Sequence, residues 1–200
     1  MQFAHFSLEF TLLQKYVSVA GIDEVGRGCI AGPVVAGIVL INDSSHCLTG
    51  IRDSKLLSES QREQFYAKIL TQYPCHAVAE ASAPEIDALG IRRATHLAML
   101  RAYWKLQTRP AVILMDGEKA TIPLPGRTYQ YNKGDMKHYA IAVASILAKV
   151  YRDRLMMTYE AQFPQYSFSS HKGYGTRKHF EEIATYGYTM LHRKTFIPES

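Results

Sequence analysis

Hydrophobic residues along the chain follow two different periods, and each period predicts one type of secondary structure. Two apolar, β-branched runs, Val17–Val25 and Pro33–Ile41, are joined by the turn Gly26-Arg27-Gly28 and predict a hairpin or two adjacent strands. Further short runs predict strands at Cys75–Ser82, Ala111–Met115 and Arg127–Asn132. The segment Thr121–Pro125, between the last two runs, is expected to be a loop.

Helix starts between these strands are marked by capping-box patterns. The pattern Ser58-Glu59-Ser60-Gln61 predicts a helix that continues to about Leu70. A second pattern, Ser82-Ala83-Pro84-Glu85, begins helical structure that Gly90 is expected to interrupt before it resumes over residues 91–107.

The C-terminal third of the chain is predicted to be mostly helical. A long helix over residues 136–160 is expected to lie close against a sheet, because small residues recur along one of its faces. These residues are Ala140, Ala144 and Ala148. A loop over Phe163–Gly175 and a helix beginning near Thr176 are predicted to complete the chain.

The order of these elements predicts an α/β fold with a central mixed β-sheet flanked by helices. The first strands follow one another, and the later strands alternate with helices. No change of composition marks a boundary, so we expect a single domain over residues 1–200, with residues 1–16 as an N-terminal lead-in segment.

Composition narrows the class of protein. The chain is 47% hydrophobic and 20% charged, which is typical of globular proteins, and no apolar run reaches the roughly 18 residues that a membrane span needs. Met1–Tyr16 has no basic leader and is interrupted by Glu9, so no signal peptide is expected. The cysteines are odd in number and form no Cys-x-x-Cys pair, which argues against disulfides and structural zinc and favours the cytoplasm. They are Cys29, Cys47 and Cys75.

Charge is distributed unevenly along the chain. Residues 1–100 carry 8 Lys/Arg and 10 Asp/Glu, a balance of −2, whereas residues 101–200 carry 15 and 8, a balance of +7. A basic C-terminal half suggests an anionic partner, of which nucleic acid is the commonest, although a merely uneven surface charge would give the same count.

Carboxylates stand at the ends of predicted elements, where active sites often lie. Asp23 and Glu24 end an apolar strand, and one of the two must face the core because neighbouring side chains of a strand point to opposite faces. Asp116 follows a second apolar strand, and Asp135 follows a Lys-Gly turn at a helix start. A helix cap would explain Asp135 equally well.

A divalent cation would compensate the cost of burying such carboxylates together. Mg²⁺ prefers oxygen ligands and is commonly held by carboxylates and substrate phosphates. Two such ions about 4 Å apart can activate a water and stabilise the leaving oxygen of a phosphodiester. The pattern therefore favours metal-dependent phosphodiester chemistry over a set of turn and cap residues.

Several stretches of the sequence resemble the motifs of ribonuclease HII, the type 2 ribonuclease H of bacteria. They occur in the order of that family and span residues 17–197. They are Gly-Ile-Asp-Glu-Val-Gly-Arg-Gly (21–28), Ala-Gly-Pro-Val-Val-Ala (31–36), Asp-Ser-Lys-Leu-Leu (53–57), Met-Asp-Gly (115–117), Lys-Gly-Asp (133–135), Ala-Ser-Ile-Leu-Ala-Lys-Val-Tyr-Arg-Asp-Arg (144–154) and His-Lys-Gly-Tyr-Gly-Thr (171–176).

The resemblance implies an RNase H-like fold and cleavage of the RNA strand of RNA–DNA hybrids, leaving 5′-phosphate and 3′-hydroxyl ends, with Mg²⁺ or Mn²⁺. Duplex DNA with embedded ribonucleotides is implied as a second substrate. The four acidic positions of the family fall on Asp23, Glu24, Asp116 and Asp135, with Asp23 as the ligand shared by both metals. Neither a membrane nor an obligate protein partner is expected, and a monomer is the default.

The resemblance also implies how the substrate is recognised. Gly26, Arg27 and Gly28 would contact the 2′-hydroxyl of the ribonucleotide, which distinguishes RNA from DNA. Glycine permits such close approach, although Gly-x-Gly alone would indicate an ordinary hairpin turn. Tyr174 matches a tyrosine that packs on the sugar at the RNA-to-DNA junction, where a loop tyrosine is otherwise more often a packing residue.

Further residues are candidates for phosphate contacts. Lys55 lies in the Asp-Ser-Lys motif, and Ser145 and Lys149 share one helical face at four-residue spacing. Lys149 has a structural alternative, because Asp153 lies one turn further along. The loop residues His171 and Lys172 are expected near the substrate.

The chain departs from the family pattern at two positions. Met136 stands where serine commonly follows Lys-Gly-Asp, and Cys29 where proline commonly follows Gly-Arg-Gly.

Two alternative functions are a binding module without catalysis and a junction nuclease on the same fold. Binding alone would disfavour four carboxylates near phosphates, and a junction nuclease has no need of the 2′-hydroxyl contacts. Ribonuclease HIII is set aside, because its extra N-terminal domain and its glutamate at the fourth acidic position are missing here.

Overall fold

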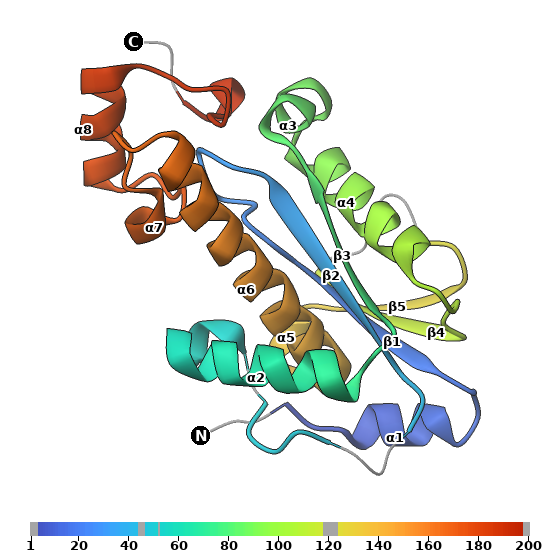
Figure 1. Cartoon of the computed structure of the whole chain (residues 1–200). Coiled ribbons are helices and arrows are strands. Elements are labelled where there is room, and N and C mark those ends of the chain that lie inside the picture. Colours follow the sequence, from blue (N-terminus) through green and yellow to red (C-terminus); the bar gives the residue numbers. More distant parts are fainter. Residues whose placement is uncertain (1–3, 44–46, 52, 118–123, 198–200) are drawn as a thin grey trace.

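A five-stranded mixed sheet forms the centre of the computed structural model, which describes residues 4–43, 47–51, 53–117 and 124–197 (Figure 1). The strand order is β3-β2-β1-β4-β5. The antiparallel pairs are β1 with β2 and β2 with β3, whereas β1 with β4 and β4 with β5 are parallel. The strands are β1 Val19–Val25, β2 Val34–Ile41, β3 His76–Ala81, β4 Val112–Asp116 and β5 Arg127–Tyr131. The predicted α/β class and mixed sheet are confirmed.

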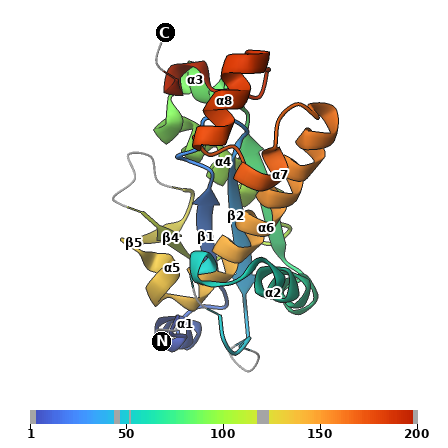
Figure 2. The same cartoon turned by 90° about the vertical axis from the view of Figure 1, so that its left-hand side faces the viewer.

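Helices cover both faces of this sheet (Figures 1 and 2). Helix α6 packs against one face together with α1 and α2, and α4 packs against the other. The helices are α1 Ser7–Leu13, α2 Glu59–Gln72, α3 Ala83–Leu89, α4 Ile91–Lys105, α5 Gly134–Lys137, α6 Tyr139–Gln162, α7 Phe168–His171 and α8 Arg177–Tyr186, with 3-10 turns η1 Ser54–Leu56 and η2 Lys194–Phe196. The sheet is therefore buried on both faces, which explains the unbroken apolar runs of its strands.

Helix α6 approaches the sheet closely because small residues meet at the contact. A Cβ added to Gly21 of β1 would lie 1.9 Å from the carbonyl oxygen of Ala140. A Cβ added to Gly37 of β2 would lie 2.7 Å from the carbonyl oxygen of Ala144. The alanine stripe expected to allow this contact does so, and the two glycines complete it.

Both predicted capping boxes form. The Ser58 side chain accepts from the Gln61 amide at the start of α2, and the Ser82 side chain accepts from the Glu85 amide at the start of α3. Gly90, at φ +75°, separates α3 from α4 as expected.

The structure corrects three predictions of secondary structure. The long helix is interrupted at His138, which has extended backbone angles, so that a short α5 precedes α6. The segment Phe163–Gly175 contains α7 rather than only a loop, and residues 7–13 of the lead-in segment form α1. Residues 121–123 of the predicted loop at Thr121–Pro125 lie outside the described part of the chain.

Glu9 of α1 caps the N-terminus of α6, although 131 residues separate it from its partner. Its side chain is fully buried, and Oε1 accepts a hydrogen bond of 2.9 Å from the Ala140 amide. No side chain of the neighbouring residues caps α6. Burial raises the pKa of Glu9 to about 7, although the backbone hydrogen bond opposes the shift.

Candidate active site

Two parallel strands bring three of the predicted carboxylates to one edge of the sheet. Because β1 and β4 run in the same direction, Asp23 and Glu24 at the end of β1 meet Asp116 at the end of β4. Asp135 reaches the same edge from α5. We call these four residues, Asp23, Glu24, Asp116 and Asp135, the carboxylate cluster.

The adjacent carboxylates of β1 point to opposite faces, as the strand period predicts. Asp23 is 4% exposed and interacts with Ser145 of α6. Glu24 is half-buried and lines the groove on the opposite side, which is also lined by residues of α4. Asp23 is therefore the member of the pair that is held inside the fold.

Burial and neighbouring negative charges raise the pKa values of Asp23, Glu24 and Asp135. Burial is the largest cause for Asp23, and the neighbouring charges of Glu24 and Asp116 raise the pKa of Asp23 further. Burial also raises the pKa values of Glu24 and Asp135. Carboxylates that destabilise one another in this way form a site that a cation would stabilise.

Hydrogen bonds and basic side chains hold the outer carboxylates of the cluster. Asp116 Oδ1 accepts from the Gly134 amide at 2.6 Å, which fixes the start of α5 against β4. Glu24 Oε1 lies 3.0 Å from Nη1 of Arg27, and Asp135 Oδ2 lies 3.7 Å from Nζ of Lys55. Among the described residues, no three His, Cys, Asp or Glu side chains are grouped closely enough to ligate one ion in this arrangement.

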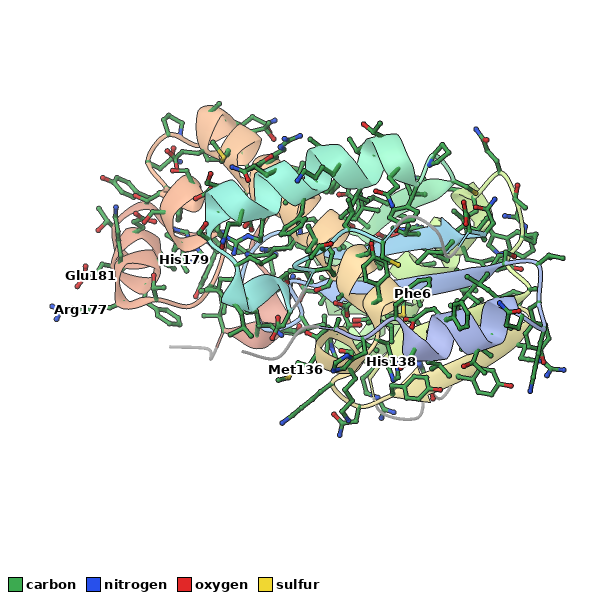
Figure 3. The ribbon with its side chains drawn as sticks, turned by 90° about the horizontal axis from the view of Figure 1, so that it is seen from below. Phe6, Met136, His138, Arg177, His179 and Glu181 are labelled. Atoms are coloured by element: carbon green, nitrogen blue, oxygen red, sulfur yellow. The ribbon has the colours of Figure 1, made fainter. Side chains whose placement is uncertain are left out.

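A groove of about 790 Å³ opens beside the cluster, and it is bordered by several basic side chains. Arg27 and Lys55 line the groove together with Glu24, Asp116 and Asp135. The other basic residues that line the groove are Arg92, Arg93 and Lys133. Met136, one of the two departures from the family pattern, lines the same groove on α5, and its position is shown in Figure 3.

The two glycines of the Gly-Arg-Gly turn have different environments. Gly26 has φ +88°, and a Cβ there would lie 2.2 Å from Nε of Arg152. Gly28 is exposed, needs no left-handed backbone, and a Cβ there would meet no atom within 4 Å. The fold therefore requires glycine at position 26, whereas it leaves open space around position 28.

Two buried arginines hold this turn, and sequence reasoning gave neither of them a role. Arg193 donates to the carbonyl oxygens of Gly26 and Gly32 at 2.7 and 2.8 Å. Arg152 donates to those of Pro33 and Lys172 at 3.0 and 2.8 Å. A signal for Arg152 was present, because it continues the four-residue spacing of the alanines that face the sheet.

Tyr174 lies close to the Gly-Arg-Gly turn. Its side chain is 41% exposed, and its hydroxyl forms a hydrogen bond with the thiol of buried Cys29. The carbonyl oxygen of Gly173 accepts from the Ile30 amide at 2.9 Å, which joins the two segments directly. Cys29, the second departure from the family pattern, thus contacts the tyrosine.

The remaining predicted residues are placed differently. Ser145 lies next to Asp23 and also bonds Ser54 Oγ at 3.0 Å. Lys149 forms the structural pair that was its alternative, with Nζ 2.7 Å from Asp153 Oδ1.

Neither His171 nor Lys172, which were expected near the substrate, lines the groove. His171 is buried, with Nε2 3.0 Å from Glu182 Oε2, and the carbonyl oxygen of Lys172 accepts from Arg152. His171 therefore belongs to the interior behind Tyr174.

Comparison with known proteins shows similarity to one protein family over nearly the whole chain. The family model described as Ribonuclease HII matches residues 20–198. A ribonuclease HII of Pediococcus pentosaceus is 47% identical over 98% of this chain and 76% of its own length.

Solved structures show the same fold. Ribonuclease H2 of Pyrococcus horikoshii superposes with a TM-score of 0.74 at 27% identity, covering 89% of this chain and 93% of that one. Bst-RNase HIII in complex with Mn²⁺ has a TM-score of 0.70 at 20% identity, covering 92% and 68%, a likeness that concerns the fold. None of the described helices is both long and apolar enough to cross a membrane.

Proposed function

The chain belongs to the ribonuclease HII family, and from this premise we propose that its carboxylate cluster cuts the RNA strand with the help of two divalent cations. As a member of this family it is an endoribonuclease that acts on RNA–DNA hybrids and depends on divalent cations. We propose Mg²⁺ or Mn²⁺ as the ions, and 5′-phosphate and 3′-hydroxyl ends as the products.

The observation that carries this proposal is the burial of Asp23 among other carboxylates. Like charges beside a buried carboxylate raise its pKa and cost stability, unless a cation compensates them. The donor set contains carboxylate oxygens alone, which suits hard cations such as Mg²⁺. The residues present therefore fit the metals that the family requires.

Each carboxylate has a distinct part in the proposed reaction. Asp23, held between β1 and α6, is the ligand shared by the two ions, and Glu24 and Asp116 are further ligands. Asp135 completes the site from α5. When bound there, the ions would supply a nucleophilic water and neutralise charge at the leaving oxygen.

Residues outside the cluster orient the substrate in this proposal. The open space at Gly28 lets the backbone approach the 2′-hydroxyl, and Arg27 lies at the same edge of the groove. Tyr174 stacks on the sugar where RNA passes to DNA. Lys55 contacts phosphate, and Ser145 acts through its contact with Asp23. Lys149 is proposed only as an indirect contributor, because Asp153 holds its ammonium group.

An assay on defined duplexes tests the proposed substrates. We expect incision of a DNA duplex that contains one ribonucleotide, as well as a continuous RNA–DNA hybrid, when Mg²⁺ or Mn²⁺ is present. The products should carry 5′-phosphate and 3′-hydroxyl ends, and an all-DNA duplex should remain intact. Cleavage of a branched all-DNA junction, without cleavage at the ribonucleotide, would instead support the junction nuclease.

Replacing Tyr174 by alanine is expected to reduce incision at a single embedded ribonucleotide more than cleavage of a continuous hybrid. Stacking of an aromatic ring on a nucleotide contributes roughly 1–3 kcal/mol, which corresponds to about one to two orders of magnitude in rate. The measurement is the mutant-to-wild-type ratio of kcat/KM on each substrate.

The matched control for this change is Tyr174→Phe, which keeps the ring and removes only the hydroxyl that contacts Cys29. It should retain most of the activity on both substrates. If alanine lowered both activities by the same factor, Tyr174 would be a packing residue rather than a reader of the junction.

A further inference from the structure

Three buried histidines lie behind the loop that carries Tyr174. We call His171, His179 and His192 the histidine cluster, and residues 171–176 the tyrosine loop. All three residues are at most 6% exposed, and the rings of His171 and His179 stack with their centroids 4.0 Å apart. Figure 3 shows His179 on the inner side of α8, whereas Arg177 and Glu181 of the same helix point outward.

The hydrogen bonds of the cluster determine which ring nitrogens carry protons. The Thr189 amide donates to Nδ1 of His192 at 2.9 Å, so the proton of this ring is on Nε2. That Nε2–H faces Nε2 of His179 at 3.1 Å, and Nε2 of His179 must therefore accept. His179 then carries its proton on Nδ1, which donates to the carbonyl oxygen of Tyr174 at 2.9 Å.

A second chain of bonds runs through His171 to the neighbouring residue. Nδ1 of His171 accepts from the Gly173 amide at 3.1 Å, and its Nε2–H donates to Oε2 of Glu182 at 3.0 Å. Each histidine thus uses one nitrogen as donor and the other as acceptor. Two of the six nitrogens bind the backbone of the tyrosine loop, one on each side of the peptide bond between Gly173 and Tyr174.

The rings are held in the neutral form that this pattern requires. Burial lowers the pKa of His179 and that of His192 to about 4, and it also lowers the pKa of His171. An added proton on any of the three rings would turn an acceptor nitrogen into a donor that faces another N–H group. The hydrogen bonds of the histidine cluster are therefore all formed at neutral pH.

The histidine bonds hold the backbone of the tyrosine loop on both sides of Tyr174. Its backbone has left-handed angles at Lys172 and Gly173, with φ +50° and +83°. The Gly173 carbonyl oxygen is already used by the amides of Ile30 and Ala31. The bond from His179 to the Tyr174 carbonyl oxygen therefore holds the backbone of Tyr174 itself, beyond the point where the loop is joined to the segment after the turn.

We propose that His179, oriented by His192, is a positioning residue for Tyr174 and that it thereby raises activity on single embedded ribonucleotides relative to continuous hybrids. This inference rests on the proposed role of Tyr174. His179 touches neither the carboxylate cluster nor the groove. Its loss should therefore change the choice between substrates more than the rate of cleavage on a continuous hybrid.

Two substitutions at one position separate positioning from general stability. His179→Asn keeps a side-chain N–H near the place of Nδ1, which can still donate to the Tyr174 carbonyl oxygen, whereas His179→Leu removes the side-chain donor and leaves only the Thr176 amide, at 2.8 Å. Both variants lose the hydrogen bond between Nε2 of His179 and Nε2 of His192, so both should lower Tm. The measured quantity is the ratio of kcat/KM on a single embedded ribonucleotide to kcat/KM on a continuous hybrid.

We expect the His179→Leu variant to lose about tenfold or more in this ratio, approaching the ratio of Tyr174→Ala. The His179→Asn variant should keep the ratio within about threefold of wild type, less than a single lost hydrogen bond would cost. The double variant Tyr174→Ala/His179→Leu should show no further loss of the ratio, because His179 acts only through Tyr174.

The control is His76→Asn, because Nδ1 of His76 also donates to a backbone carbonyl oxygen, that of Tyr73 at 2.6 Å, but at β3. It should leave the ratio unchanged. An unchanged ratio in His179→Leu, beside a reduced ratio in Tyr174→Ala, would overturn the positioning role alone. An unchanged ratio in Tyr174→Ala would overturn both that role and the proposed function of Tyr174. Equal loss in the leucine and asparagine variants would also overturn the inference. If the leucine variant did not fold, a tenfold loss of the kcat/KM ratio in His179→Asn would overturn the inference.

Discussion

Replacing Asp23 by asparagine is expected to reduce cleavage by at least about two orders of magnitude while the fold is kept. A metal ion contributes several kcal/mol to such a reaction, and each 1.36 kcal/mol is a factor of ten in rate. Asparagine has the shape of aspartate and keeps an oxygen that can accept from the Glu24 amide, as Oδ1 does at 2.8 Å. The measurement is kcat/KM on a hybrid in Mg²⁺, with binding of the hybrid followed separately.

The same change is expected to raise the Tm of the metal-free protein near neutral pH. The folded pKa of Asp23 is above the ordinary value, so its ionisation costs stability as pH rises from about 4 through the folded pKa. Asparagine removes this cost, and each kcal/mol recovered raises Tm by about 2–4 °C.

Glu9→Gln is the matched control for Asp23→Asn. Burial also raises the pKa of Glu9, to about 7, but Glu9 lies on α1 outside the carboxylate cluster. This variant should gain stability above pH 7 by the same reasoning and retain its activity. If Asp23→Asn kept more than a few per cent of the wild-type rate, Asp23 could not be the ligand shared by both ions.

Replacing Gly28 by valine is expected to block incision at a single embedded ribonucleotide without unfolding the turn. A Cβ added at this position meets no atom within 4 Å, and the backbone there is not left-handed, so the fold itself does not require glycine. It would occupy the space through which the backbone approaches the 2′-hydroxyl. We expect kcat/KM to fall by about one to two orders of magnitude, because hydrogen-bonding groups left unpaired cost about 1–3 kcal/mol.

Gly26→Val provides the contrast for this experiment. A Cβ at Gly26 would lie 2.2 Å from Nε of Arg152, and its φ of +88° disfavours valine, so this variant should lose both activity and stability. Gly28→Val should lose activity alone, with unchanged Tm and unchanged affinity for all-DNA duplex. A parallel loss of Tm in both variants would show that Gly28 is needed for the turn rather than for the substrate.

Local signals in the sequence predicted the sheet and the carboxylate cluster. Unbroken apolar runs mark strands that are buried on both faces, and capping boxes at Ser58 and Ser82 mark helix starts through contacts only three residues long. The carboxylates were found because charge at the end of an apolar strand is costly without a compensating group. These features depend on neighbours in the chain.

Contacts between distant segments could not be predicted in the same way. The break at His138 is accompanied by a backbone bridge to His5, and the cap of α6 comes from Glu9. Arg193 bonds the carbonyl oxygen of Gly26, 167 residues away, and a backbone carbonyl leaves no mark in a sequence. The histidine cluster likewise became recognisable only when α8 and the segment after it were placed side by side.

The cap that Glu9 provides means that the part of the chain matched by the family model is shorter than the unit that folds together. The family model begins at residue 20, after α1, yet the central helix receives its N-terminal cap from α1. A fragment of the protein that began where the family model begins would lack α1, and the first turn of α6 would lose the Glu9 carboxylate that accepts from its Ala140 amide. In chimaeras of related sequences, α1 and α6 are best taken from the same parent, since α1 supplies the N-terminal cap of α6.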